Sequence, residues 1–204
     1  MINRLPELKE TPSQTAGPYV HIGLTPNFCD IGGVFPLDAG ITMLAKETPG
    51  QRITITGRVM DGSDAPVTDA VVELWQADAD GNHPQTSDSP DKAFTGWGRQ
   101  PTDATGTFRF ETIKPGLVAG PDGVPQAPHV SLWIVARGIN IGLATRLYFA
   151  DEAEANQADP VLNRVLDPRR RQTMIATASQ ADGATTYTLD IRLQGENETV
   201  FFDI

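Results

Sequence analysis

The sequence predicts an all-β protein, an antiparallel β-sandwich with an extended N-terminal arm and little helix. Three observations support this fold class. Several short segments alternate apolar and polar residues, as half-buried strands do. The 204 residues include 19 glycines and 16 prolines, so turns are frequent. A helical pattern is confined to 151–165, and Pro160 divides that segment into two short pieces.

The first 50 residues form the predicted arm. Six prolines and six glycines interrupt the segment 1–50. Because proline fixes φ and removes a backbone donor, regular structure is not expected there. We therefore expect residues 1–50 to pack on a partner chain, and residues 51–204 to form one sandwich domain.

Predicted strands follow the arm, separated by turn residues such as Asp61 and Gly62. In the segment 187–193 every second residue is apolar, so one face of that strand must be buried. Two acidic residues in the first turn of 151–165 suit a helix N-terminus. The predicted strands are 53–59, 71–75, 106–113, 129–135, 145–149, 187–193 and 199–203.

Composition excludes several classes of protein. The formal net charge of −10 opposes binding to nucleic acid. The basic cluster 169–171 indicates a solvated turn or a contact with a partner chain. No apolar run is long enough for a membrane span, and the N-terminus has no secretion signal, so we expect a cytoplasmic protein. The single cysteine, Cys29, excludes an intrachain disulfide and a cysteine-based zinc site.

Five segments together carry a resemblance to a known family. They are TAGPYVHIG, GRVMDGSDAPVTDAVVELWQADADGNH, FTGWGRQPTDATGTFRFETIKPG, APHVSLWIVARG and ATRLYF. In this combination they resemble the intradiol ring-cleavage dioxygenases, over most of the chain. The resemblance is closest to the α chains of family members that are built from related α and β chains.

The resemblance implies a sandwich fold with a non-haem ferric ion held by two tyrosinates and two histidines. Phenolate ligands suit a hard trivalent ion. The residues here differ at three of the four positions: His83 and Val118 stand where tyrosines are expected, and His129 and Ser131 where paired histidines are expected. Gln126 stands where the family has a nearby arginine. We therefore predict no catalytic residue and no metal in this chain, with the non-haem Fe(III) held by a homologous β chain.

By resemblance, two segments of this α-type chain complete the substrate pocket of the β chain. Thr15, Gly17 and Tyr19 match an arm segment that lines the pocket, and Arg137 matches a residue near the ring substituent of the substrate. A guanidinium can hold a carboxylate through two charge-assisted hydrogen bonds. The alternative interpretation is that the arm residues form a turn or pack at the subunit junction, and that Arg137 is a charge at a strand end.

The implied reaction is intradiol cleavage of protocatechuate with O2 to 3-carboxy-cis,cis-muconate by a hetero-oligomer of αβ units. One alternative is a subunit that acts on another anionic catechol, such as 4-sulfocatechol. Another is a metal-free β-sandwich that serves as a binding or scaffold protein. A neighbouring reading frame with both tyrosines and the paired histidines would favour the enzyme.

Overall fold

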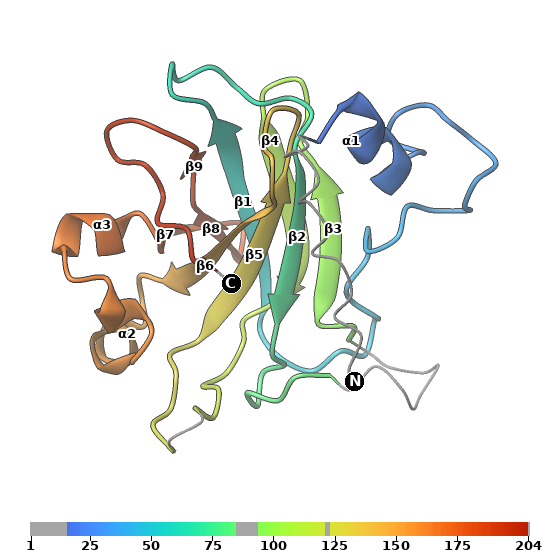
Figure 1. Cartoon of the computed structure of the whole chain (residues 1–204). Coiled ribbons are helices and arrows are strands. Elements are labelled where there is room, and N and C mark those ends of the chain that lie inside the picture. The colour runs from blue at the N-terminus through green and yellow to red at the C-terminus, as the bar shows by residue number, and fades with distance from the viewer. Residues whose placement is uncertain (1–15, 85–93, 121–122, 204) are drawn as a thin grey trace, which may run out of the picture.

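A computed structural model describes residues 16–84, 94–120 and 123–203 (Figure 1). The regular structure in this part of the chain is mostly strand. Its helices are α1 (Pro18–Leu24), α2 (Ala153–Ala158), the 3-10 helix η1 (Leu162–Arg164) and α3 (Pro168–Gln172). Its strands are β1 (Arg52–Met60), β2 (Val71–Gln76), β3 (Trp97–Pro101), β4 (Thr107–Ile113), β5 (His129–Val135), β6 (Leu143–Phe149), β7 (Ile175–Ala181), β8 (Ala184–Thr188) and β9 (Ile191–Arg192).

The strands form one strongly curved sheet that nearly closes on itself. Their order is β3-β2-β5-β6-β7-β8-β1-β4, and β9 pairs with β1. The end strands β3 and β4 contact each other, so apolar side chains from opposite halves of the sheet share one interior. The β-sandwich prediction is thus confirmed at the level of a β-rich, nearly closed sandwich or barrel.

The predicted purely antiparallel pairing is wrong, because the sheet is mixed. Strand β6 runs parallel to β7, and β1 runs parallel to both β8 and β9. Parallel neighbours need a crossover connection, and the segment that carries α2, η1 and α3 provides it between β6 and β7. The structure has helix within the predicted segment 151–165, as α2 and η1, whereas α3 and the effect of the crossover on strand direction were not predicted.

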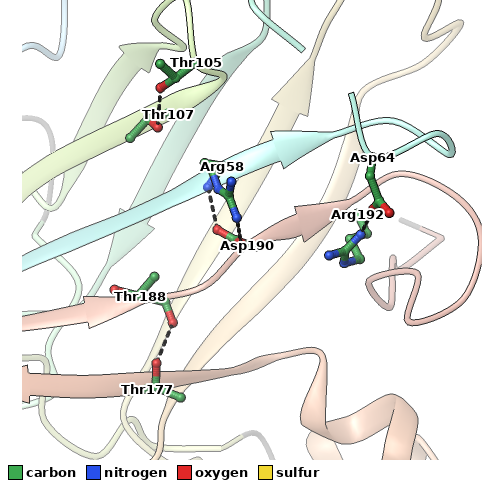
Figure 2. Close-up of polar contacts among 8 residues, drawn as sticks. All are labelled: Arg58, Asp64, Thr105, Thr107, Thr177, Thr188, Asp190 and Arg192. Carbon is green, nitrogen blue, oxygen red and sulfur yellow. Dashed lines mark hydrogen bonds and ion pairs between the residues drawn. The ribbon is translucent and has the colours of Figure 1, made fainter. Parts of the chain in front are cut away.

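Four features of the strand prediction need correction. Strands β3 and β7 were not predicted, and the expected strand 199–203 makes an isolated bridge from Phe202 to Ala144. The predicted strand 187–193 is divided between β8 and β9. At the division, the carboxylate of Asp190 accepts hydrogen bonds from the backbone N–H and the guanidinium of Arg58, at 3.0 and 2.9 Å (Figure 2). This pair fixes the bend between β8 and β9 against β1.

The core lies inside the curved sheet. Alternation places Phe108 and Phe110 of β4 inward, where they meet buried residues of β1 and β5. A smaller cluster around Tyr148 and Leu162 lies between β6 and the crossover helices. Tyr148 and Tyr187 are both buried, as predicted for core or sheet residues.

The N-terminal segment is more structured than predicted. Helix α1 begins at Pro18, where a proline loses no hydrogen bond because the first helical N–H groups have no intrahelical partner. Farther along, the backbone N–H of Arg99 in β3 donates to the carbonyl of Gly40 at 2.9 Å. Gly40 has φ +79, and a Cβ there would lie 2.7 Å from the Arg99 nitrogen. The end of the predicted arm thus packs on the edge of this chain's own sheet.

None of the helices in the described part of the chain has the length and apolar character that a membrane span requires.

Candidate functional site

The beginning of α1 lies against the loop that follows β5. The N–H of Ala16 donates to the carbonyl of Ile139 at 3.1 Å, and the N–H of Gly138 donates to the carbonyl of Ala16 at 3.3 Å. Gly138 has φ +90, so a glycine suits this turn. These two hydrogen bonds bring Gly17, in the arm, next to the loop that carries Arg137. We call this place the arm junction.

Arg137 is held at one edge and open at the other. Its Nε forms an ion pair with Oδ2 of Asp69 at 2.9 Å. The side chain of Asp69 is 17% exposed, whereas that of Arg137 is 64% exposed. The Asp69 contact is at Nε, and most of the Arg137 side chain is open to solvent. That geometry suits two-pronged binding of a carboxylate or sulfonate.

The predicted arm residues Thr15, Gly17 and Tyr19 have different surroundings in the structure. Thr15 lies outside the described residues. Gly17 precedes α1 with φ −97 and ψ −176, an extended conformation, and nothing lies within 4 Å of a Cβ built there. Tyr19 is 83% exposed on α1. Within the described residues, Gly17 and Arg137 are thus brought together, while Tyr19 projects into solvent.

Exposed apolar side chains gather along 19–41. Monomeric proteins rarely expose so many large apolar residues in one stretch unless it is an interaction surface. We call this set the arm face. Its members are Tyr19, Val20, Phe28, Ile31, Val34, Phe35, Leu37 and Ile41.

The resemblance implies iron ligands at four positions, and the residues found there do not form a suitable ligand set. His129 is buried, and its Nδ1–H donates to the carbonyl of Ala127 at 2.7 Å. Burial, aided by the nearby Arg146 charge, lowers the pKa of His129 to about 4. Its neighbour on the same strand face is the hydroxyl of Ser131, while Val118 is buried hydrocarbon and His83 is exposed. One imidazole with a hydroxyl does not fit a ferric ion. We derive no iron-dependent step for this chain.

In the part of the chain that the structure describes, no three His, Cys, Asp or Glu side chains lie close enough together to hold a metal ion.

A guanidinium network lies beside His129. Nη1 of Arg146 donates to Oε1 of Gln126 at 2.8 Å and to the hydroxyl of Tyr148 at 3.3 Å. That hydroxyl donates to the buried carboxylate of Asp159 at 3.1 Å. Burial raises the pKa of Tyr148, so the phenol stays protonated. Sequence reasoning missed Arg146 and Asp159. The only available signal was the alternation in β6, which places Arg146 and Tyr148 on one face.

Comparison with known proteins agrees with the fold. A dioxygenase family model matches residues 25–195. The chain belongs to this dioxygenase family. The predicted resemblance is therefore confirmed.

Individual relatives refine the assignment. The chain is 50% identical to the protocatechuate 3,4-dioxygenase alpha chain of Pseudomonas putida over 200 residues, 96% of this chain and 97% of the relative. It is 34% identical to the protocatechuate 3,4-dioxygenase beta chain of Burkholderia cepacia over 182 residues, 80% of this chain and 74% of the relative. The predicted role as an alpha-type subunit of an oxidoreductase in this family is confirmed.

A solved structure supports the same family. The dioxygenase domain of a dioxygenase carbohydrate-binding protein fusion from Streptomyces sp. SirexAA-E matches with a TM-score of 0.60 and 27% identity. The match covers 83% of this chain and 95% of that domain.

Proposed function

We propose that this chain is the non-iron-binding α subunit of a protocatechuate 3,4-dioxygenase and completes the substrate pocket of an iron-bearing β subunit. The complete enzyme would cleave protocatechuate with O2 between the two hydroxyl-bearing carbons, giving 3-carboxy-cis,cis-muconate. The observation that carries this proposal is the arm junction, where two backbone hydrogen bonds hold Ala16 against the loop of Arg137. Similarity to both an alpha and a beta chain supports a hetero-oligomer of αβ units.

The residues of this chain bind and orient the substrate. The open edge of Arg137 binds the ring carboxylate, and the ion pair with Asp69 restricts where that guanidinium can point. Gly17 brings the backbone of the arm close to the substrate, with Thr15 and Tyr19 beside it. A ferric ion held by the partner would supply the chemistry that makes the catechol ring reactive towards dioxygen.

The arm also makes the contact with the partner. The arm face exposes large apolar side chains within residues 19–41. Burying them against the β chain would contribute apolar area to an interface of the order of 2,000 Å² or more. We propose that residues 1–50 act mainly in this contact, that 51–204 form the sandwich domain, and that the complex is cytoplasmic.

Steady-state kinetics of the αβ complex test the proposal. Arg137→Ala should lower kcat/KM for protocatechuate by about 10- to 100-fold, as expected for loss of a hydrogen bond to a charged group. The loss for unsubstituted catechol should be far smaller, and the iron content should not change. Arg137→Lys should restore part of the loss, because a point charge lacks the planar fork.

A matched control is Arg109→Ala, which removes an exposed, ion-paired arginine from β4. It should leave the ratio of kcat/KM values between the two substrates unchanged. An equal loss for both substrates in Arg137→Ala would mean that the arginine supports the subunit junction and does not bind the carboxylate.

A second candidate substrate follows from the same geometry. The exposed edge of Arg137 would serve a sulfonate nearly as well as a carboxylate. Comparing kcat/KM for 4-sulfocatechol with that for protocatechuate distinguishes the two.

A further inference from the structure

A cavity of about 660 Å³ opens on the outer face of β2, β5 and β6, and nothing in the proposed function uses it. Its floor begins with one row of residues across three strands: Trp75 lies opposite Ser131, and Ser131 lies opposite Arg146. The floor thus offers an indole, a hydroxyl and a guanidinium in sequence. The volume lies in the range of small-molecule pockets.

A second row of residues across the same three strands extends the cavity floor, and its one carboxylate is neutralised by an arginine. Trp133 lies between Glu73 and Ala144. The carboxylate of Glu73 accepts from Nε and Nη2 of Arg99, at 2.8 and 2.6 Å, so its charge is compensated. Trp133 and Trp75 therefore give the cavity two aromatic surfaces.

The charge of Arg146 is the feature that points to an anion. Its hydrogen-bond partners within the described residues, Gln126 and Tyr148, are both neutral. The nearest carboxylate in the network, Asp159, is reached through the Tyr148 hydroxyl and also accepts three backbone N–H groups. A half-buried guanidinium whose direct partners are neutral gains most from an incoming carboxylate.

The walls add a second cation and a third ring. Arg164, at the end of η1, and Phe202, near the C-terminus, both line the cavity. The carboxylate of Asp203 lies at the rim and is exposed, so water screens its charge. Arg164 is exposed too, so the half-buried Arg146 is the main cation of the cavity. Aromatic surfaces beside this guanidinium match a planar ring that bears an anionic group.

We propose that this cavity binds a small aromatic carboxylate, with the ring between the tryptophans and the carboxylate on Arg146. Binding here is independent of Arg137 and of the partner's iron. Each αβ unit then holds two such ligands, one at the arm junction and one in this cavity.

Isothermal titration of the αβ complex with 4-hydroxybenzoate, which lacks the second hydroxyl group, tests the proposal. The wild type should bind two equivalents per αβ unit. Ser131→Leu, which fills the cavity floor, should bind one. Arg146→Gln should weaken the same site by about tenfold or more, and 4-hydroxybenzamide should bind that site at least tenfold more weakly than the acid.

Two further variants separate the cavity from the arm junction. The exposed-arginine control Arg109→Gln should still bind two equivalents. Arg137→Ala should lose the other site and retain the one that Ser131→Leu removes. If no αβ complex forms, the proposed function is contradicted. The full chain alone should then still bind one equivalent, and Ser131→Leu should lose it, which would support this site. A single equivalent that Arg137→Ala abolishes, or two equivalents that persist in Ser131→Leu, would overturn the proposal.

Discussion

The arm junction and the outer face of β6 each hold an arginine, but the two arginines have different partners. At the junction, Arg137 has a charged partner in Asp69, and its side chain is mostly exposed. On β6, Arg146 has neutral hydrogen-bond partners and is half-buried within a connected network. The first arrangement depends on one ion pair at the surface. The second ties the side chain through Tyr148 to the buried Asp159, while its direct partners among the described residues stay neutral.

This contrast predicts different consequences of mutation in the two regions. Changes to the network of Arg146, Tyr148 and Asp159 should lower stability and leave substrate preference unchanged. Changes to the arm junction should alter association or substrate preference and leave stability almost unchanged.

The largest expected effect is the loss of stability when Asp159 is replaced. Its buried carboxylate accepts from the Tyr148 hydroxyl and from the N–H groups of Ala127, Val161 and Leu162, at 2.7–3.1 Å. Asp159→Ala leaves these donors unsatisfied and should lower the free energy of unfolding by about 3–5 kcal/mol. Chemical denaturation measures the change. The control Asp167→Ala removes an exposed helix cap and should cost about 1 kcal/mol.

The second prediction concerns pH. The folded pKa of His129, about 4, lies below its unfolded value of about 6.5. The unfolded chain therefore binds more protons between these values, and the stability from a neutral His129 is complete above about pH 6.5. That stability, up to about 3 kcal/mol, is lost as pH falls towards 4. His129→Gln should flatten this part of the stability–pH curve. Parallel curves for the two proteins would contradict the buried, neutral imidazole.

The third prediction concerns the arm face. Tyr19→Ser removes a large, exposed aromatic group and should raise the Kd of the αβ complex by about tenfold, as for a typical interface anchor. Leu166→Ser is the matched control, since Leu166 is 84% exposed but lies beside α3, far from the arm (Figure 1). Equal changes in Kd for the two substitutions would mean that the arm face does not contribute specifically to binding of the β chain.

The smallest effect is expected at Asp69. Asp69→Asn keeps the shape of the side chain but removes the charge that holds Arg137. It should lower kcat/KM for protocatechuate by about 3- to 10-fold relative to catechol, with iron content unchanged. The control Asp190→Asn weakens the ion pair between Arg58 of β1 and the bend between β8 and β9 (Figure 2). It should leave that ratio unchanged.

Local patterns predicted only part of the fold. The segment of β5 alternates clearly, because one face meets the core, and it was predicted at its observed bounds. Strand β7 is exposed at most positions, so it has no apolar period and was missed. Strand β3 was missed because it is short and contains Gly98 and Pro101. Pro18 was interpreted as a breaker, although proline is favoured at the first helical position.

The candidate site shows the same limit. Arg137 and Gly17 were predicted from a family resemblance, not from any local pattern. Asp69 and Asp159 were missed because their partners are distant in sequence and meet them only in the folded chain. The mixed strand directions follow from the crossover through α2, η1 and α3, and alternation within single strands carries no information about direction.

A crystal structure of the αβ complex with bound protocatechuate or 4-hydroxybenzoate, with iron located by anomalous scattering, tests the central claim most directly. We predict one iron per αβ unit, held by the partner, and a ligand carboxylate within hydrogen-bond distance of the terminal nitrogens of Arg137. Iron bound at His129 in this chain, or a carboxylate at the partner's iron site that does not contact Arg137, would contradict the account.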